Sequence, residues 1–525
     1  MSAQDPFGEL RSLLQAPPNP RNWSALCTLV EAFDPGRFED DYSAYVLDHL
    51  REWPAPLRSC PRRWLDRAIA GDHIPYARLA RGISLPGQGI RDDDARRIMA
   101  LPLLAHMSYI DLSGNWLTPE AAEHIARSAY LSKVRRLILD KNRLRNQGAR
   151  HLARAASLHG VRELSVARND VGQGGLDALH TAPFAPGLVS LDLSDNSLHT
   201  DDARALARAG LERLVELRME HTNLSDAGVH ALVDERSTLT SLTILDLSRN
   251  RITAEGARHI AWMAQEHILN TLSLAGNHVR DQGLHYLADS ARLDTLATLD
   301  LRNNSIRDHG LHALTGAPYL GALQSLSLSS NAITAQGAQI LSQVEALGAL
   351  RALFLDQNEI GDRGFLALTK WHMFPKLERL HLRQNDLGVL AMRALAALGQ
   401  PMALRELALD YNVIGDSGAR LIAEATHLSR LRALELDTAR IGPDGVGALM
   451  RAPHLATLER LSLRHNNLGD AGALHIANSP NVAGLVELDL SSTSIGARSR
   501  GAVALATSPY LPEHIRAQWR PAPRS

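Results

Sequence analysis

A group of aromatic, histidine and charged residues between positions 354 and 411 offers the clearest chemistry in this sequence. Acidic, basic and acidic side chains recur there at a spacing of 27 residues, at Asp356, Arg383 and Asp410. Aromatic rings and arginine often anchor protein interfaces, so the group predicts a binding surface for another protein. The residues assigned to this surface are Phe354, Asp356, Arg379, His381, Arg383, Asp410 and Tyr411.

The same charges also have a purely structural interpretation. If the regular spacing places these residues on adjacent strands, their side chains lie about 5 Å apart and form a ladder of opposite charges. The sequence leaves both interpretations open. Phe354 is expected to be exposed. Of the residues in this group, an exposed phenylalanine is the one that a charge ladder explains least well. Trp116, with Tyr109 close by, predicts a second and weaker aromatic site on the same face.

No motif in the sequence predicts catalysis, a cofactor or a metal site. The glycine clusters at residues 87–89 and 172–175 lack the lysine of a phosphate-binding loop and do not complete a dinucleotide fingerprint. The 23 histidines follow no metal-ligand spacing. The acidic run of residues 92–94 is typical of a helix start. We therefore expect a protein that is not an enzyme and carries no cofactor or metal.

The elements that position the candidate residues come from a repeat. An apolar residue recurs sixteen times with a period of 27 residues, which shortens once to 26 and lengthens once to 28. A period of about 20–50 residues is typical of a solenoid. The recurring residues are Leu85, Leu112, Leu139, Val166, Leu193, Met219, Leu247, Leu274, Leu301, Leu328, Leu355, Leu382, Leu409, Leu436, Leu463 and Leu490.

Each repeat follows the pattern L-x-x-L-x-L-x-x-N-x-[IL]-x-x-x-G-x-x-x-L. Its alternating leucines predict a short strand with one buried face, and the glycine and leucine four residues apart predict a helix. All strands are expected to run parallel, because the same connection joins each strand to the next. The glycine is expected to let the helix approach the strand closely.

An asparagine follows the recurring apolar residue by three positions in twelve repeats. Its amide offers donors and an acceptor, so we expect it to satisfy backbone groups of buried turns rather than to bind a ligand. Thr222, Thr493 and Ala439 replace it in three repeats. The twelve are Asn115, Asn142, Asn169, Asn196, Asn250, Asn277, Asn304, Asn331, Asn358, Asn385, Asn412 and Asn466.

The strings GARHLA, GARHIA, GARLIA and GALHIA, which begin at Gly148, Gly256, Gly418 and Gly472, follow strands of this pattern. They closely resemble leucine-rich repeats of the ribonuclease-inhibitor-like subfamily, over roughly residues 83–505. The resemblance implies an α/β solenoid, a horseshoe of about sixteen 27-residue strand–helix units with parallel strands on the concave face. The cysteines and the strong acidity of the best-known member are missing, so nuclease inhibition is not implied.

The two ends of the chain do not show the repeat. We expect residues 1–80 to form a helical N-terminal cap, residues 81–507 the repeat domain, and residues 508–525 a C-terminal cap or tail. Within the N-terminal segment, the pattern predicts a helix capped by Asn22, a helix over 38–53, and short helices over 61–70 and 74–79. Prolines 509 and 512 exclude a long helix in the tail.

Composition limits the classes of partner and location. The formal net charge is −1, without the basic stripe of a nucleic-acid-binding protein. The sequence has no apolar run that could cross a membrane, and its N-terminus lacks the pattern of a secretory signal. Cys27 and Cys60 are too few for a disulfide framework and are expected to stay free. We expect a cytoplasmic protein that binds neither nucleic acid nor membrane, and the arginine- and alanine-rich composition suggests a bacterial genome.

These observations predict a monomeric, non-enzymatic scaffold that binds a protein of unknown identity on the concave face of the horseshoe. Two alternatives stay open. Similar repeats occur in some plant-pathogen effectors with an F-box, so residues 1–80 would make the chain an F-box-like adaptor. The repeats also resemble those of a GTPase-activating protein of the leucine-rich-repeat type, which would need an exposed arginine such as Arg143 or Arg251.

Overall fold

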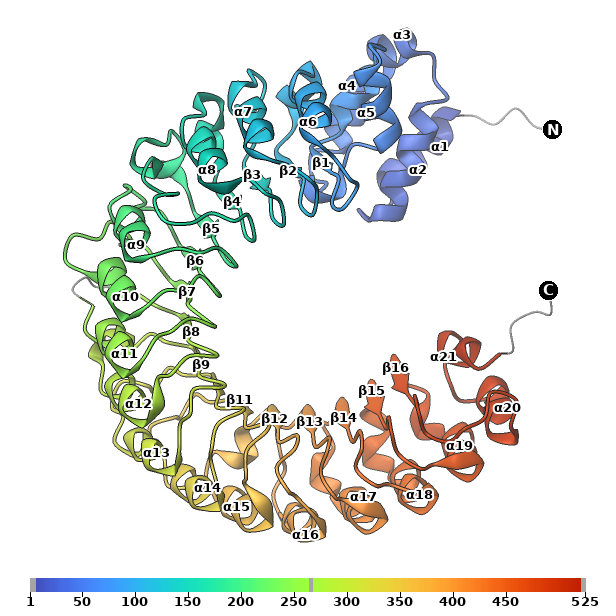
Figure 1. The fold of residues 1–525 in the computed structure, drawn as a ribbon. Coiled ribbons are helices and arrows are strands. Elements are labelled where there is room, and N and C mark those ends of the chain that lie inside the picture. The colour runs from blue at the N-terminus through green and yellow to red at the C-terminus, as the bar shows by residue number, and fades with distance from the viewer. Residues whose placement is uncertain (1–5, 264–267, 521–525) are drawn as a thin grey trace, which may run out of the picture. The chain divides into compact units, whose positions relative to one another are not determined.

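The computed structural model describes residues 6–263 and 268–520. The chain forms two compact units: unit 1 comprises residues 1–250 and 264–267, and unit 2 comprises residues 251–263 and 268–525. In both units short parallel strands alternate with helices, which confirms the predicted α/β solenoid. Within each unit the strands line the inner side of an arc and the helices its outer side (Figure 1).

Unit 1 contains seven described strands, each paired in parallel with the next. The strands are β1 Gly82–Ser84, β2 Tyr109–Asp111, β3 Arg136–Ile138, β4 Glu163–Ser165, β5 Ser190–Asp192, β6 Glu216–Arg218 and β7 Ile244–Asp246. The helices between them are α6 Asp92–Met99, α7 Pro119–Arg127, α8 Arg145–Ala153, α9 Thr200–Ala207 and α10 Asp226–Val233. The glycine-rich stretch 172–175 has low helix propensity, and short 3-10 turns replace the α-helix between β4 and β5.

Unit 2 continues the same alternation. Its described strands are β8 Thr271–Ser273, β9 Thr298–Asp300, β10 Ser325–Ser327, β11 Ala352–Phe354, β12 Arg379–His381, β13 Glu406–Ala408, β14 Ala433–Glu435, β15 Arg460–Ser462 and β16 Glu487–Asp489. Its helices are α11 Ala254–Ala261, α12 Arg280–Ala288, α13 Asp308–Thr315, α14 Ala335–Leu341, α15 Gly361–Leu368, α16 Val389–Ala396, α17 Gly415–Glu424, α18 Pro443–Arg451, α19 Gly469–Ala477, α20 Arg500–Thr507 and α21 Glu513–Gln518. The six-residue α21 agrees with the prediction that prolines exclude a long helix near the C-terminus.

The N-terminal part of unit 1 is helical, as predicted, but its boundaries differ. The segments are α1 Pro6–Gln15, α2 Pro20–Val30, α3 Pro35–Arg37, the π-helical turn Phe38–Tyr42, α4 Ser43–His49, α5 Arg62–Ile69 and the 3-10 turns Ala55–Leu57 and Pro75–Leu79. The assignment of Asn22 as a cap was wrong. Pro20 takes the first turn of α2, so Asn19 is the N-cap and its side chain accepts a hydrogen bond from the Asn22 N–H at 2.8 Å.

Residues 58–60 pair with the first strand of the sheet. Ser59 forms a parallel bridge with Gly82, and the Cys60 N–H donates to the Gly82 carbonyl at 2.7 Å. An open sheet edge exposes unpaired backbone groups, so this pairing protects the outer side of β1. Cys27 and Cys60 are both buried and free, as expected.

The recurring asparagines have the structural role that the sequence predicted. The Asn412 amide nitrogen donates to the carbonyls of Leu382, Leu409 and Asp410 at 2.8–3.2 Å, and its oxygen accepts the N–H groups of Asn385 and Leu387 at 3.0 Å. The side chain is fully enclosed, with 1% of the residue exposed. Each such asparagine therefore joins its own turn to that of the preceding repeat.

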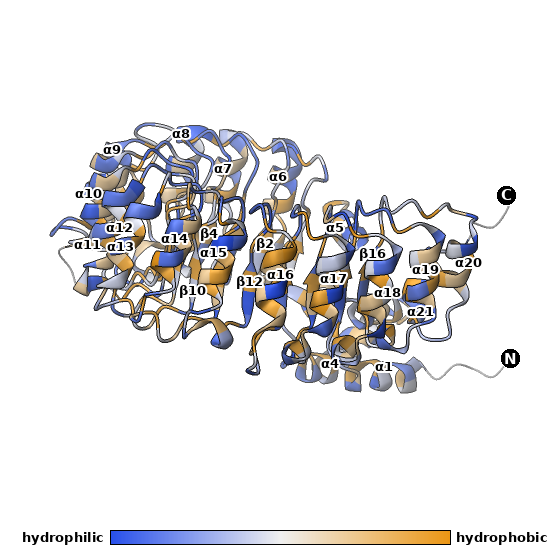
Figure 2. Cartoon of the chain, turned by 90° about the horizontal axis from the view of Figure 1, so that it is seen from below, coloured by the Kyte–Doolittle hydropathy of each residue, from blue (hydrophilic) through white to orange (hydrophobic). Residues whose placement is uncertain are grey.

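The recurring glycine allows close approach of two helices, whereas the sequence predicted close approach of a helix and a strand. A Cβ on Gly310 would lie 2.9 Å from the Cα of Asp281, and a Cβ on Gly364 would lie 2.9 Å from the Cα of Ala335. Both neighbours belong to the start of the preceding helix, so the glycine allows close helix–helix rather than helix–strand approach. Helices α16 and α17 carry both hydrophobic and hydrophilic residues (Figure 2), and α16 buries Ala391, Met392 and Leu395.

Candidate functional site

The seven candidate residues from Phe354 to Tyr411 lie on the strand face of unit 2, the side of its sheet away from the helices. The strand register pairs Phe354 with His381, His381 with Ala408, and Ala408 with Glu435. Asp356, Arg383 and Asp410 each come two residues after the end of their strand, in equivalent positions of successive repeats. The 27-residue spacing therefore brings them together, as the sequence predicted.

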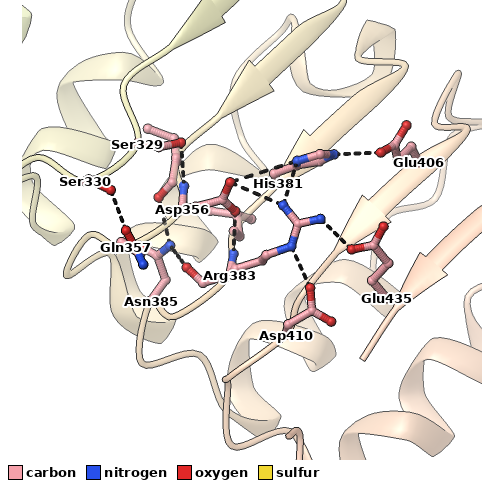
Figure 3. A network of polar contacts seen from close by, with 12 residues as sticks. Ser329, Ser330, Asp356, Gln357, His381, Arg383, Asn385, Glu406, Asp410 and Glu435 are labelled. Carbon is pink, nitrogen blue, oxygen red and sulfur yellow. Dashed lines mark hydrogen bonds and ion pairs between the residues drawn. The ribbon is translucent and has the colours of Figure 1, made fainter. Parts of the chain in front are cut away.

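Arg383 is the centre of this site (Figure 3). Its Nε donates to Asp410 Oδ2 at 2.6 Å, its Nη1 lies 3.4 Å from Asp356 Oδ2, and its Nη2 donates to Glu435 Oε2. The Arg383 N–H also donates to Asp356 Oδ1 at 2.8 Å. One guanidinium thus contacts three carboxylates from three other repeats.

His381 extends the polar network toward the next strand. Its Nε2 lies 2.9 Å from Glu406 Oε1, and its Nδ1 lies 3.0 Å from Arg383 Nη1. Its ring meets the Phe354 ring edge-on, with a centroid separation of 4.7 Å and an interplanar angle of 89°. The Arg379 guanidinium lies 5.6 Å from the Phe354 centroid. Phe354 is therefore half-buried, and the expectation that it is exposed was wrong.

Tyr411 is the exposed aromatic residue of the site, with 58% of its surface accessible. Its φ of 58° lies in the left-handed region, which disfavours side chains with a Cβ. Gly114 and Gly276 take the equivalent position in other repeats, with φ of 64° and 67°. The turn geometry therefore does not require a tyrosine there.

Burial changes the protonation of the central carboxylate. Burial raises the pKa of Asp410 to about 6, although hydrogen bonds from the Asp437 N–H and from Arg383 favour its charged form and lower the pKa. The charge of Glu435 raises it further. Burial alone would lower the pKa of Arg383, but its hydrogen bonds and ion pairs with Glu435 and Asp410 outweigh that effect and raise it.

Asp410→Asn is expected to remove a pH dependence of stability. The ordinary pKa of 3.8 rises to about 6 on folding, so the folded protein binds this proton more tightly. The stabilising contribution is complete below the ordinary pKa and is lost as the pH rises through 6. The free energy of unfolding of the wild type, relative to the variant, should fall by about 2 kcal/mol between pH 4.5 and 7. Urea unfolding across this range tests the sign, and a difference that rises with pH would contradict it.

A groove of about 910 Å³ lies beside the Arg383 network on the same face. Its lining includes short side chains of one repeat, namely Ser325 and Ser327 on β10 and Ser329 two residues after that strand. Phe354 and Tyr411, which also line it, are much larger. The groove is hollow because β10 carries serines where the next two strands carry larger side chains, as at Ser327, which pairs with Phe354, which in turn pairs with His381.

Trp116 does not join this site, because it lies in unit 1. It follows β2 in the turn before α7, outside any strand, and 54% of it is exposed. The Arg143 guanidinium lies 4.8 Å from the centroid of its ring. The other seven assigned residues come together in unit 2.

Two contributors were not assigned to the site from sequence. Glu406 contacts His381, and Glu435 contacts Arg383 although 52 residues separate the two in the chain. Glu406 is the first residue of β13 and Glu435 the last of β14, so both occupy strand positions on the open face. A tabulation of these positions across repeats would have identified them. It would also have revealed the serines of β10.

Comparisons with known proteins place the chain in a broad class. Residues 238–261, 323–342, 401–423 and 454–477 match the family model described as Leucine Rich repeat. No curated protein sequence is significantly similar to this chain. The match and the repeated strand–helix units identify the chain as a leucine-rich repeat protein.

Solved structures with similar folds come from diverse organisms. An internalin from Listeria monocytogenes is 20% identical, with a TM-score of 0.45, over 71% of this chain and 92% of that chain. The complex of Rad7 and Elc1 in yeast gives 21% identity and a TM-score of 0.42, over 62% and 79%. The ectodomain of the plant receptor kinase GASSHO1/SCHENGEN3 from Arabidopsis thaliana, in complex with CASPARIAN STRIP INTEGRITY FACTOR 2, gives 16% and 0.30, over 82% and 58%.

Two features of the described residues bear on the class of site. Within residues 6–263 and 268–520, no group of three or more histidine, cysteine or acidic side chains is placed to hold a metal ion. None of the helices in those ranges is long and apolar enough to cross a membrane.

Proposed function

We propose that this chain is a non-enzymatic recognition scaffold that binds a protein partner on the strand face of unit 2. Leucine-rich repeats typically form extended surfaces for protein binding. The observation that carries the proposal is the groove of about 910 Å³ lined by Phe354, His381, Arg383 and Tyr411. Grooves that place aromatic and arginine side chains beside one another are typical of the energetic centres of interfaces.

The exposed Tyr411 supports this function over a charge ladder alone. The ion pairs of Arg383 account for the packing of the carboxylates around it, but they do not involve Tyr411. Other repeats carry polar residues at this left-handed position, such as Gln384 and Thr438, so the turn gives no reason for an exposed tyrosine. A partner that packs on the ring would give it a role.

Selection of short peptides from a random displayed library tests the proposal. We expect peptides selected on the wild-type chain to bind at least tenfold more weakly to the double variant Phe354→Ala, Tyr411→Gly. Glycine at 411 removes the side chain and suits the φ of 58° there, so the fold should be retained. Circular dichroism checks that it is.

The matched control is the double variant Leu366→Ala, Leu390→Ala. These exposed leucines lie on α15 and α16 of the same unit, so their loss removes apolar surface from the helix side. Peptide affinity should not change. Ligands that lose affinity only with the leucine variant would overturn the proposal and place binding on the helices.

Several finer features belong to the same proposal. We assign the repeats to the ribonuclease-inhibitor-like subfamily because of their 27-residue units. The two free cysteines support a reducing, cytoplasmic location. Residues 1–80 would act as the N-terminal cap, supported by the pairing of Ser59 with Gly82. The proposal also takes the protein to be a monomer from a bacterial source. The F-box-like adaptor and the GTPase activator stay as alternative functions.

A further inference from the structure

The last strand of unit 2 has an open edge. β16 pairs with β15 on one side, and no described segment pairs with its other side, whereas residues 58–60 pair with the outer side of β1. In the preceding repeat, the N–H groups of Leu463 and His465 each donate to a carbonyl of the last repeat at 3.0 Å. The equivalent donors of the last repeat are the N–H groups of Leu490 and Ser492. Within the described residues neither has an acceptor, so both are free to pair with a further strand.

A cavity of about 390 Å³ lies along this edge. Residues 486–491 line it from β16 and the turn after it, and Gln518 and Trp519 line it from the C-terminal end of α21. Helix α21 lies beside β16 (Figure 1), where His514 Nε2 is 2.8 Å from the Val486 carbonyl oxygen. The helix end therefore leaves room for a single extended chain beside the strand, but it would obstruct a second copy that paired through its own β16.

The charge beside the open edge is negative. The described residues that line the cavity include the acids Glu487 and Asp489 and no basic residue. Asp489 lies 3.6 Å from Arg464, whereas Glu487 is exposed and forms no ion pair within the described part of the chain. Arg460, which faces Glu487 in the strand register, lies 3.6 Å from Glu406 instead. The charge of Glu487 is therefore available to a basic side chain beside it.

The same fold already pairs an arginine with a glutamate across adjacent parallel strands. Arg136 and Glu163 are the first residues of β3 and β4 and are paired in register. Arg136 Nε lies 3.3 Å from Glu163 Oε2. Opposite charges at facing positions of a sheet stabilise the pairing of its strands. A basic residue at the first position of a strand added beside β16 would likewise face Glu487, the first residue of β16.

We infer that β16 accepts an extended segment of a partner protein as a further parallel strand, with an arginine or lysine opposite Glu487. Carbonyl groups of the segment accept the N–H groups of Leu490 and Ser492. In recognition by strand addition, main-chain hydrogen bonds supply affinity and the side chains beside the strand supply specificity. The cavity shares no lining residue with the groove at Phe354, so the inference does not rest on the proposed function.

Binding of three synthetic peptides to the full chain tests the inference. An arginine peptide alternates valine with arginine, a glutamate peptide carries glutamate in place of arginine, and a proline peptide carries proline in place of valine. Proline has no N–H and cannot complete a strand ladder. At low salt, the arginine peptide should slow hydrogen exchange of the Leu490 and Ser492 amides about tenfold, and the other two peptides should not. In the free chain, these amides should exchange faster than the bonded amides of Leu463 and His465.

A charge-matched pair of variants separates the edge from general attraction of a basic peptide to the chain. Glu487→Gln should weaken binding of the arginine peptide, measured by fluorescence anisotropy, about fivefold, as expected for loss of one exposed charge at contact distance. Glu424→Gln changes the net charge equally at the exposed end of α17 and should have no effect. Equal effects of the two variants, or no protection of the Leu490 and Ser492 amides by the arginine peptide, would overturn the inference.

Further measurements identify any other occupant or site. The double variant Phe354→Ala, Tyr411→Gly should bind the arginine peptide as the wild type does, and a loss would place the peptide in the groove. Removal of residues 521–525 should leave binding unchanged, and binding that appears only after this removal would make the chain's own C-terminus the occupant. A dimer of the free chain that the arginine peptide dissociates would make a second copy the occupant. Each of these three contrary results would overturn the inference.

Discussion

Arg383→Met is expected to lower the free energy of unfolding of unit 2 by about 3 kcal/mol at pH 8. Methionine retains much of the aliphatic length of the side chain but removes the charge shared by Asp356, Asp410 and Glu435. The side chain of Asp410 is only 5% exposed, so water cannot replace the lost cation. An uncompensated buried carboxylate is among the most destabilising single changes in a protein.

The loss should shrink as the pH falls. Without Arg383, the pKa of Asp410 rises above its wild-type value of about 6, because the cation that favours the charged form is gone. The folded variant then binds more protons than the unfolded chain from about pH 4 to above pH 6, so its stability increases as the pH falls through that range. At pH 5 we expect about half of the penalty seen at pH 8.

Arg379→Met provides the matched control in the same repeat, at the first residue of β12 and four residues before Arg383. Arg379 is exposed and contacts the Phe354 ring, so the same substitution should cost less than about 1 kcal/mol at either pH. Repeat proteins can unfold in parts, so hydrogen exchange of the β11–β14 amides should accompany urea unfolding. Equal losses in the two variants, or a loss at Arg383 that does not change with pH, would show that the cluster is not held by this charge.

Asn412→Ala is expected to destabilise the same repeats by about 4 kcal/mol at any pH between 5 and 8. The change removes three donated and two accepted hydrogen bonds and leaves backbone groups of Leu382, Asn385, Leu387 and Leu409 without this partner. Each buried group left unsatisfied costs about 1–3 kcal/mol, and water can enter only where the turn opens. Hydrogen exchange of the Asn385 and Leu387 amides should accelerate most.

Asn478→Ala is the control for this prediction. Asn478 is exposed, and its side chain donates one hydrogen bond to the Leu474 carbonyl at the end of α19. Its replacement should cost less than about 1 kcal/mol, because water can satisfy the freed carbonyl. A loss at Asn412 no larger than this would mean that the turns do not depend on the asparagine amides.

The natural alanine at position 439 shows what limits the expected loss. Ala439 keeps its own N–H bonded to the amide oxygen of Asn466 at 3.1 Å, and its carbonyl accepts the Gly415 N–H at 2.9 Å. The asparagine of the next repeat therefore still secures half of this turn. For the same reason, Asn412→Ala should disturb the turns of its own and the preceding repeat and leave more distant repeats intact.

The close recurrence of one pattern made the repeats predictable from sequence. An apolar residue about every 27 residues, in most repeats a leucine, gives each strand the same register, and a repeated connection gives each strand the same direction. The asparagines were interpretable for the same reason, since each turn must satisfy the same backbone groups. The N-terminal segment has no recurrence, and there the N-cap of α2 was wrong and the helix predicted over 38–53 ends at His49.

The site was predictable only to the level of the backbone. The spacing placed Asp356, Arg383 and Asp410 on adjacent repeats, because equivalent positions of a solenoid lie side by side. It could not show that Arg383 reaches Glu435 two repeats away or that His381 covers Phe354. Those contacts depend on side-chain conformations, which the neighbouring side chains determine.

The sequence by itself determined the class of protein, the parallel strands, the buried leucines and the role of the asparagines, since all of these follow from periodicity and local hydrogen-bonding needs. Only the tertiary structure decided which charged residues share one guanidinium, that small serines leave a hollow beside Phe354, and that Trp116 belongs to another unit. These outcomes depend on side-chain length, burial and the three-dimensional position of each repeat, and a linear pattern does not specify them.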